Sequence, residues 1–374
     1  MEKAFMNFSP FLMAQFNAKW QAGSLQNWHS SNPQPFDWHE LEALTKTDLA
    51  RYLKKTPLTY EPMQGDETLR SLLIQHYHST QTVQTAQNVM LTSGAQEAIF
   101  LVMNALLSNG DHAITFSPCF EPLVTVAQNT GADVTTLPLQ AEKAWSIDWP
   151  QLEASFRNNT RVLIINFPHN PTGSHIKKSE LLRLLDLCDK HNCWLFSDEV
   201  FRGLEHDSQF RLPVASDLYD KAIAMGVMSK ALALPGIRLG WLSTQNVNVL
   251  QKMITIKSHL SICQSSLDTQ VCQAIIPHSE LIWQRNLAII TKNKKHIEDG
   301  IVNHPSFHWQ APKASATGFI QLKHQSALTF TIKVADKKKI LLMPNEMFLC
   351  DHQGFRISLG IHSATFDIAK LINP

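Results

Sequence analysis

The chain has 374 residues, which is enough for two to three domains of ordinary size or for one large fold with a smaller one appended. Hydrophobic residues make up 44% of it and charged residues 17%, so it is too apolar for a disordered chain and not apolar enough for a bundle of membrane helices. The net charge is +1 and no basic cluster is longer than 337–339, which excludes the charge pattern of nucleic-acid-binding proteins.

The start of the chain and its cysteines indicate the cellular compartment of the protein. The first 16 residues lack the apolar core and the cleavage site of a secretion signal. The longest apolar runs, such as 162–165, are strand-sized and far below the roughly 18 residues that span a bilayer. The cysteines form no C-x-x-C pair and no framework spacing: Cys119, Cys188, Cys193, Cys263, Cys272 and Cys350. Reduced thiols of this kind are typical of cytosolic proteins, so we expect a cytoplasmic protein without a membrane partner.

Hydrophobic periodicity predicts the elements in chain order. Residues 1–45 match neither a helical nor a strand pattern and are expected to wrap between the larger and the smaller fold. From about residue 60, short β-branched runs alternate with amphipathic stretches. The predicted strands are 89–92, 113–116, 134–137, 162–167, 194–200, 223–228 and 238–243, and the predicted helices are 96–107, 121–129 and 178–191. This alternation is typical of a buried, mainly parallel sheet.

The pattern changes after about residue 247. A long helical tract runs through 272, and another covers 287–301. Short strands at 319–322 and 355–359 follow, with helical segments between them. We therefore expect a separate, smaller α+β unit at the carboxyl end of the chain.

Polar residues that directly follow the predicted strands are the candidate ligand-binding residues, because ligands of open α/β sheets bind outside the carboxyl ends of the strands. The turn Thr92–Gln96 consists of small residues between a strand and a helix, where backbone N–H groups and the helix N-terminus can hold a phosphate. Such a turn also serves geometry alone. The stretch Asn166–Gly173 places prolines on both sides of Asn170, which predicts a rigid turn, either merely structural or holding the amide through a cis bond before Pro171.

Two further strands carry charged residues. Asp198 interrupts an otherwise apolar strand, where a carboxylate is costly without a cationic partner, so a functional role is favoured. Lys230 directly follows the predicted strand 223–228. A partly desolvated lysine there has a lowered pKa and can attack carbonyls, although a lone lysine at a strand end is more often a solvated loop residue.

Taken together, these motifs resemble the fold-type I, pyridoxal-phosphate-dependent aminotransferases of class I and II, and the match runs through most of the chain. The motifs stand in the family's order: Tyr60 with Gly65 and Leu69–Arg70, Ser93–Ala95, Pro118–Phe120, Asn170–Gly173, Asp198–Val200, Ser229–Lys230, Arg238–Gly240 and Phe355–Arg356. The resemblance implies an α/β fold whose large domain holds a mostly parallel, mixed seven-stranded sheet sandwiched by helices. It also implies a smaller α+β domain built from the two chain ends, with segments 1–45, 46–265 and 266–374. Residues 1–45 would join the small domain and cover the active site.

The resemblance implies pyridoxal 5'-phosphate as cofactor and a role for each residue, with no metal. Lys230 would hold the cofactor aldehyde as a Schiff base and later move the proton at the substrate Cα. Asp198 would keep the pyridine nitrogen protonated. Asn170 would donate to the ring's phenolate oxygen and contact the substrate, and Arg356 would clamp its α-carboxylate with a bidentate fork.

The remaining cofactor ligands follow from the same resemblance. Phe120 would stack on the ring. The phosphate would be held by Ser93, Gly94, Ala95, Gln96, Ser229, Arg238 and Tyr60. Tyr60 would come from a second subunit, which implies a homodimer.

Two positions depart from the family pattern. Phe201 stands where the family usually has a tyrosine that helps Asn170 stabilise the phenolate. Losing that donor raises the pKa of the Schiff base, so we expect a protonated, yellow cofactor linkage near neutral pH. Val227 stands where the family often has a serine that binds the phosphate, which leaves more of this task to Ser229 and Arg238.

The substrate stays open, because no charge in the stretch Trp28–Asn32 indicates a dicarboxylate or a guanidinium side chain. Transamination between an L-amino acid and a 2-oxo acid is the favoured reaction. The alternative is a lyase, cyclase or oxidase on the same scaffold, since the chain is also similar to a branch that includes capreomycidine synthase and arginine-oxidising enzymes. A transcription regulator with a fused DNA-binding domain is disfavoured, because only about 45 residues precede the match. A catalytically dead binding protein is disfavoured because the key lysine, aspartate and arginine are all present.

Overall fold

The computed structural model describes residues 10–20, 25–78, 82–301, 304–362 and 366–372. Its helices are α1 (Leu12–Trp20), α2 (Trp38–Thr45), α3 (Leu49–Lys55), α4 (Glu67–Tyr77), α5 (Ala95–Leu106), α6 (Pro122–Asn129), α7 (Trp149–Ala154), α8 (Lys178–Lys190), α9 (Ala215–Leu218), α10 (Val247–Lys257), α11 (Ser266–Ile275), α12 (Ser279–Ile301), α13 (Ala327–Lys338) and α14 (Ala369–Ile372). Many begin at a side chain that accepts a hydrogen bond from a backbone N–H of the first turn: Asp37, Asp48, Asp66, Asp148, Asn246, Ser265 and Ser326. Such caps satisfy N–H groups that have no partner within the helix.

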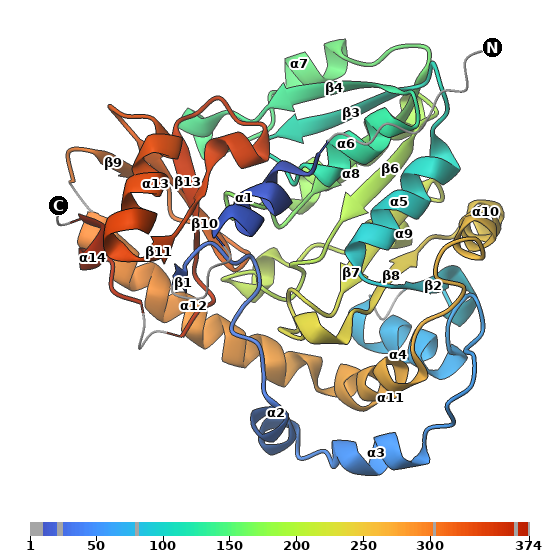
Figure 1. The fold of residues 1–374 in the computed structure, drawn as a ribbon. Helices are drawn as coiled ribbons and strands as arrows, with labels where there is room; N and C mark the ends of the chain where they lie inside the picture. The colour runs from blue at the N-terminus through green and yellow to red at the C-terminus, as the bar shows by residue number, and fades with distance from the viewer. Residues whose placement is uncertain (1–9, 21–24, 79–81, 302–303, 363–365, 373–374) are drawn as a thin grey trace.

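A seven-stranded sheet forms the centre of the larger part of the molecule (Figure 1). Its strands are β2 (Val89–Thr92), β3 (His112–Ser117), β4 (Asp133–Pro138), β5 (Thr160–Asn166), β6 (Trp194–Asp198), β7 (Ala222–Val227) and β8 (Gly240–Ser243), in the order β2-β8-β7-β6-β5-β3-β4. Strand β8 runs antiparallel to both neighbours, and the other pairs are parallel. The predicted mixed, mostly parallel sheet of seven strands is confirmed.

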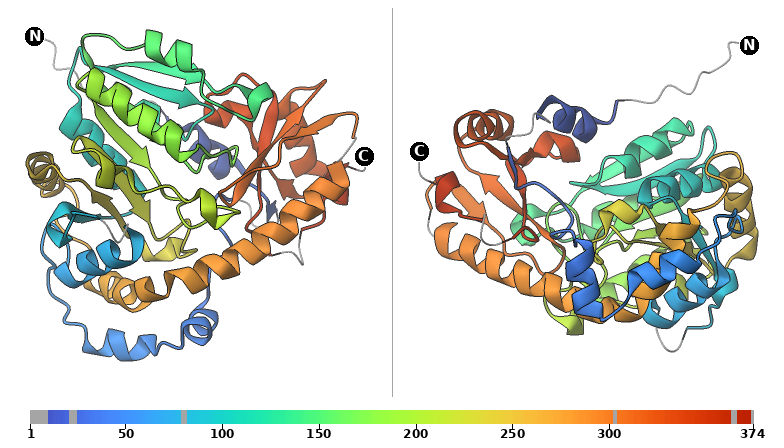
Figure 2. Two further views of the ribbon diagram at one scale, coloured as in Figure 1. Left: turned by 180° about the vertical axis from the view of Figure 1, so that it is seen from behind. Right: turned by 60° about the horizontal axis from the view of Figure 1, so that its bottom comes forward.

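Helices cover both faces of this sheet, which explains its apolar strands. Helices α5 and α6 lie on one face, and the view from behind in Figure 2 shows α8 on the other. All residues of β2 and β7 are buried, as expected for strands covered on both faces. One hydrophobic cluster includes Ile99 of α5 and another includes Leu184 of α8, so a core lies on each side of the sheet.

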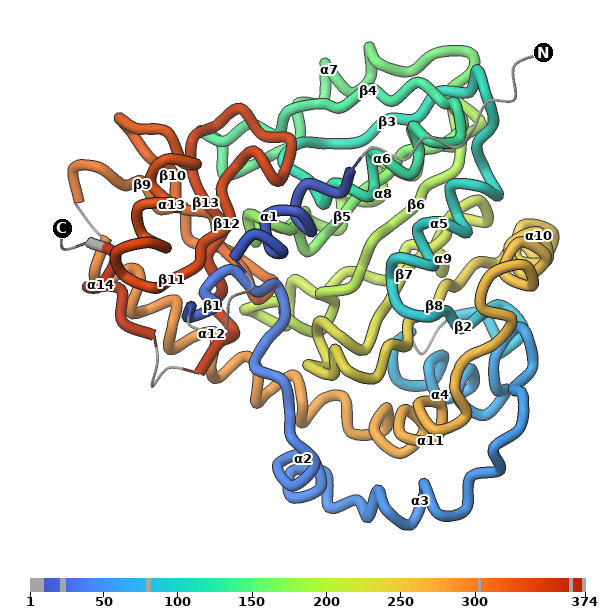
Figure 3. The backbone as a smooth tube through the Cα atoms, viewed as in Figure 1, coloured from blue at the N-terminus to red at the C-terminus, as the bar shows by residue number. Residues whose placement is uncertain are grey.

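The smaller part is an antiparallel sheet with helices against it, built from both ends of the chain. Its four strands are β9 (Phe307–Trp309), β10 (Thr317–Leu322), β12 (Met343–Pro344) and β13 (Gly354–Ser358), in the order β12-β13-β10-β9. Beside it, β1 (Gln26–Asn27) pairs in parallel with β11 (Ile340–Leu341). Helix α12 runs from this part toward α11, and the tube in Figure 3 shows the chain passing from β1 to α2 at the edge of the larger part. The predicted smaller α+β unit is confirmed.

Several predicted boundaries are wrong. Residues 1–45 contain α1 and α2 in their described portion, where we predicted no regular structure; Asp37 caps α2 by accepting from the backbone N–H of Glu40 at 2.8 Å. The helical tract through 272 is two helices, because the chain leaves helical geometry between α10 and α11 and Ile262 has a φ of 63°. Strand β6 ends at Asp198, so this carboxylate closes the strand rather than interrupting it.

Candidate active site

A cavity of about 150 Å³ lies at the carboxyl ends of the central strands, where polar side chains were expected. It collects residues from the turns after several strands and from the segment before α2. Its lining residues are Ser31, Ala95, Gln96, Phe120, Asn166, Asn170, Asp198, Val200, Phe201, Ser229, Lys230 and Arg238. Eight residues named from the sequence as site residues are thus brought together: Ala95, Gln96, Phe120, Asn170, Asp198, Ser229, Lys230 and Arg238.

The turn after β2 is shaped for close approach of an anion. Gly94 has a φ of +80°, and a Cβ at this position would lie 2.8 Å from Nη2 of Arg238. The N–H groups of Ala95 and Gln96 open α5 and have no acceptor within the helix. The N–H of Gly94 donates to Thr92 O at 2.8 Å, and that of Ser93 donates to the Glu97 carboxylate. Of the four N–H groups in this turn, those of Ala95 and Gln96 therefore remain for a ligand.

Arg238 lies with its guanidinium directly beside this turn. Its guanidinium is exposed, and Nη1 donates to Pro235 O at 3.3 Å. Within the described residues it forms no salt bridge, so its charge is available to a ligand. Of the predicted phosphate ligands, Ala95, Gln96, Ser229 and Arg238 thus line one cavity, while Val227, the family's serine position, is buried at the end of β7.

Asp198 is a buried carboxylate, 3% exposed, at the end of β6. Its Oδ1 accepts a hydrogen bond from the Val200 N–H at 3.2 Å. Burial raises the pKa of Asp198 to about 7, although the Val200 N–H and the Lys230 amine oppose the rise. A cationic ligand at this carboxylate would restore its charge.

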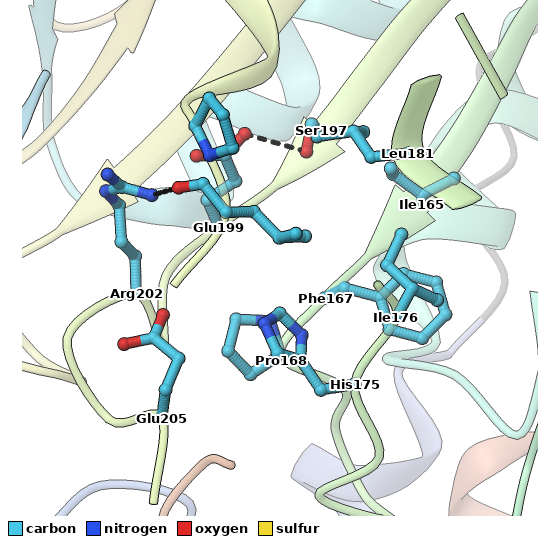
Figure 4. A pocket seen from close by; sticks show the side chains of 12 residues that line it. Ile165, Phe167, Pro168, His175, Ile176, Leu181, Ser197, Glu199, Arg202 and Glu205 are labelled. Carbon is cyan, nitrogen blue, oxygen red and sulfur yellow. Dashed lines mark hydrogen bonds between the residues drawn. The ribbon is translucent and has the colours of Figure 1, made fainter. Parts of the chain in front are cut away.

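Glu199 lies on the opposite side of the strand end, because successive side chains point to opposite faces. Figure 4 shows it with Ser197, Arg202 and Glu205 around a separate small cavity. Its Oε1 accepts from Ser197 Oγ at 2.9 Å and from the Ala215 N–H at 2.9 Å. These contacts tie the strand end to α9, so the two neighbouring carboxylates have different tasks.

Lys230 follows β7, and its side chain extends into the cavity. Its Nζ donates a hydrogen bond to Ser31 Oγ at 2.6 Å. Burial is the main cause that lowers the pKa of Lys230 to about 7, with a smaller contribution from Arg356, while Asp198 acts in the opposite direction. The lowered pKa favours the uncharged, nucleophilic form of this amine near neutral pH.

Arg356 on β13 is 2% exposed and does not line the cavity itself, but it reaches a residue that does. Its Nη1 donates to Oδ1 of Asn170 at 3.0 Å, and its Nε donates to the His29 carbonyl at 2.9 Å. The guanidinium also lies over the ring of Phe348, 5.0 Å from the centroid. Burial lowers the pKa of Arg356 to about 9, and no carboxylate pairs with it in the described part of the chain.

Asn170 is fixed by its backbone and by Arg356. Its N–H donates to Oδ1 of Asn166 at 2.9 Å, and the Asn170–Pro171 bond is cis, as the sequence suggested. Because Oδ1 accepts from Arg356, the Nδ2 group is left as a donor toward the cavity.

Aromatic and aliphatic side chains complete the cavity. Phe120 contacts Phe11 edge-to-face, with centroids 6.0 Å apart. Val200 and Phe201 lie in the same lining, and Phe201 is buried. The cavity therefore combines an apolar wall with the polar and charged groups described above.

Tyr60 lies outside this cavity. Its side chain is 87% exposed and lines a separate open groove with Leu58, Ser261 and Gln264. Within one chain it therefore does not reach the other site residues.

Sequence reasoning missed three lining residues. Asn166 closes β5, so the strand-end rule would have found it. Val200 follows Asp198 by two residues and belongs to the motif Asp198–Val200, but the resemblance implies no role for it. Ser31 had no such signal, because it belongs to an irregular segment 199 residues away from Lys230.

Two other kinds of feature are absent from the described residues. No helix there is long and apolar enough to cross a membrane. No group of three or more His, Cys, Asp or Glu side chains there could hold a metal ion.

The sequence matches the family model "Aminotransferase class I and II" over residues 26–369. It is 26% identical over 334 residues to capreomycidine synthase of Streptomyces vinaceus, covering 88% of this chain and 84% of that protein. It is 32% identical over 220 residues to a probable kynurenine–oxoglutarate transaminase of Saccharomyces cerevisiae, covering 55% of this chain and 49% of that protein.

Solved structures of pyridoxal-phosphate-dependent enzymes are similar to this chain. A PLP-dependent aminotransferase from Streptococcus suis superposes with a TM-score of 0.90 at 25% identity, covering 98% of this chain and 96% of the other. The PLP-dependent cyclase OrfR superposes with a TM-score of 0.87 at 21% identity, covering 100% and 97%, which is a likeness of fold.

Proposed function

Since this chain belongs to the class I and II aminotransferase family and is a pyridoxal-phosphate-dependent transferase, we propose that it moves the amino group of an L-amino acid to a 2-oxo acid through Lys230. One observation carries the assignment of roles. A buried arginine, Arg356, has no carboxylate partner among the described residues and is hydrogen-bonded to the wall of the cavity that holds the Lys230 amine and the Asp198 carboxylate.

The residues of the cavity fit the cofactor. Where Gly94 lacks a side chain, a phosphate can approach the Arg238 guanidinium and the open N–H groups of α5. Asp198 is buried and forms no salt bridge in the described residues, as suits a carboxylate that receives a pyridinium N–H. Both features support Ala95, Gln96, Ser229, Arg238 and Asp198 as cofactor ligands.

When bound, pyridoxal phosphate supplies an electron sink that weakens the bonds at the substrate Cα. Lys230 would then act as base and acid: its neutral amine would take the proton from Cα, and the resulting ammonium group would release it again. Its pKa of about 7 suits a group that both accepts and releases a proton near neutral pH. Asp198 keeps the ring nitrogen protonated by its charge, and the apolar lining excludes water from the exchange.

Arg356 and Asn170 orient the substrate. With Nε and one N–H of Nη1 committed to the His29 carbonyl and to Asn170, the guanidinium keeps three N–H donors for an α-carboxylate. The free Nδ2 of Asn170 provides a further donor, which can bind either the substrate or the phenolate oxygen of the cofactor. A fixed carboxylate places the Cα proton in reach of Lys230.

Because Tyr60 does not reach the cavity of its own chain, we infer that it contributes to the cavity of a second copy of the chain. Exposed apolar side chains gather at and near the open groove that Tyr60 lines: Leu58, Met63, Leu260, Ile262 and Leu267. Such a cluster supports a homodimer in which Tyr60 reaches the partner's phosphate site. We also infer three segments, 1–45, 46–265 and 266–374, and a cytoplasmic location, which the six unpaired cysteines support.

A complementation experiment tests the cross-subunit role. Lys230→Ala and Tyr60→Ala proteins, each of low activity, are unfolded together and refolded as a mixture. If Tyr60 acts across the interface, mixed dimers contain one intact site and activity returns. Activity that stays at the level of the separate variants would contradict the cross-subunit role.

The reaction itself is tested by mixing the yellow holoprotein with a panel of amino acids and following its visible spectrum. Conversion of the cofactor to pyridoxamine phosphate with release of a 2-oxo acid is the expected result. A cyclised amino acid would instead favour the second candidate, which the match to capreomycidine synthase over 88% of this chain motivates. Ammonia with pyruvate would indicate a lyase, and oxygen uptake an oxidase. Turnover by Lys230→Ala would refute the role of Lys230.

A further inference from the structure

The segment before α2 is held firmly by the smaller part of the molecule. Strand β1 pairs with β11, the Trp28 N–H donates to Leu341 O at 3.1 Å, and the Ser358 N–H donates to Trp28 O at 2.7 Å. Arg356 then binds the next carbonyl, that of His29. The backbone is therefore fixed up to two residues before Ser31.

A tight turn aims the following residues. The N–H groups of His29 and Ser30 both donate to Oδ1 of Asn27, at 3.1 and 3.0 Å. The Ser30 hydroxyl is used locally, since it donates to the Asn32 carbonyl at 3.3 Å. Ser31, in contrast, lines the cavity, and its Oγ accepts from Lys230 Nζ at 2.6 Å. Within the described part of the chain, the Lys230 amine makes no hydrogen bond other than this one.

The contact joins two parts of the molecule. Lys230 extends from the turn after β7 of the large sheet, whereas the segment that carries Ser31 is anchored to β11 and β13. The hydroxyl therefore fixes where a flexible side chain on one part lies relative to the other. Without it, four rotatable bonds let the amine sample the cavity.

The chemistry of a hydroxyl suits an amine that changes its charge. A serine can accept from an ammonium group and can donate to the lone pair of a neutral amine. The charged groups that face Lys230 are Asp198 from β6, Arg356 from β13 and Arg238 just before β8. A carboxylate in place of the hydroxyl would add a second negative charge and stabilise the ammonium. A hydroxyl orients the amine in both protonation states without that effect.

We propose that Ser31 is a positioning residue for Lys230: its hydroxyl holds the amine, whenever the cofactor does not occupy it, at the place from which it exchanges a proton with the substrate Cα. This proposal rests on the proposed role of Lys230. It concerns proton transfer and therefore applies whether the final product is a 2-oxo acid or a cyclised amino acid.

The first test measures proximity and needs no turnover. In the full-length protein freed of cofactor, the pH dependence of Lys230 labelling by trinitrobenzenesulfonate, read by peptide mass spectrometry, gives the pKa of the amine. Ser31→Asp should raise this pKa by one unit or more, so that labelling at pH 7 slows about fivefold or more. Ser30→Asp is the matched control and should label like the wild type. Wild-type labelling kinetics in Ser31→Asp would overturn the proposal.

The second test measures positioning in the holoprotein. Ser31→Ala should lower kcat about tenfold, leave KM nearly unchanged and increase the deuterium isotope effect with substrate labelled at Cα, because proton transfer becomes slower. Ser31→Thr keeps a hydroxyl and should restore both values, and thermal melting checks that each variant folds. An unchanged isotope effect with unchanged kcat in Ser31→Ala would overturn the proposal. Failure of the proposed function is read separately, since the wild-type Lys230 would then not be labelled by pyridoxal phosphate and borohydride.

Discussion

Replacing Arg356 by lysine should weaken substrate recognition by an amount that follows from its hydrogen bonds. Of five N–H donors on the guanidinium, one serves the His29 carbonyl and one serves Oδ1 of Asn170, which leaves three. A lysine that kept both partners would retain one donor for the α-carboxylate in place of a bidentate pair. The loss of one charge-assisted hydrogen bond costs about 1.5–3 kcal/mol, so kcat/KM should fall about 10- to 100-fold.

The assay compares an amino acid with its decarboxylated amine in the half-reaction that produces pyridoxamine phosphate. Arg356→Lys should slow the amino acid and leave the amine almost unaffected, since the amine has no carboxylate to lose. Phe348→Leu is a matched control, because it removes the ring beneath the guanidinium and spares the hydrogen bonds. Equal losses for amino acid and amine in Arg356→Lys would refute the assignment of Arg356 to the carboxylate.

Three further predictions concern the cofactor, the backbone and pH. Phe201→Tyr adds a donor to the cavity and should lower the pKa at which the visible absorbance of the holoprotein changes; a wild-type cofactor already deprotonated at pH 7 would contradict the premise. Gly65→Ala should reduce the free energy of unfolding by about 2–4 kcal/mol in denaturant titrations, because φ is +101° and the new Cβ would lie 2.3 Å from a leucine side chain. Gly110→Ala, with φ of +85° and open space, should cost about 1 kcal/mol, and equal losses would rule out the clash. Burial lowers the pKa of His29 and His169 to about 3, below the unfolded value near 6.5, so these groups stabilise the fold above pH 6.5 and lose that contribution on acidification. From pH 7.5 to 5.5 the free energy of unfolding should fall by about 1.4 kcal/mol for each, measured by denaturant titration; a flat profile would contradict this.

The central sheet and the residues at its strand ends could be predicted because one rule governs both. Parallel strands that alternate with helices bring their carboxyl ends to one edge, so Asn170, Asp198 and Lys230 meet although they are far apart in sequence. The role of each residue came from the resemblance to a family rather than from this rule. The strand-end rule alone gives a site and leaves its chemistry open.

Features that depend on contacts between distant irregular segments could not be predicted. Ser31 contacts Lys230 across 199 residues, and no local pattern marks such a pair. Helix α1 was missed because its nine residues are a short stretch, and its first N–H groups are satisfied by a distant carboxylate: the Leu12 N–H donates to Oε2 of Glu121 at 2.9 Å. Helix α2, in contrast, has a local signal in Asp37 and Glu40 that the sequence reading overlooked.

Strand β1 cannot pair with β11 until most of the chain has been synthesised. Gln26 leaves the ribosome early, but its partner Ile340 lies 314 positions later, the difference of the two residue numbers. At about 5–20 residues per second, the amino-terminal segment waits about 15 to 60 s before it can pair. All strands of the large sheet are made in that interval, so Lys230 and Asp198 are synthesised before the segment carrying Ser31 can pair with β11. The contact between Ser31 and Lys230 is therefore among the last in this site that the growing chain can fix in its final form.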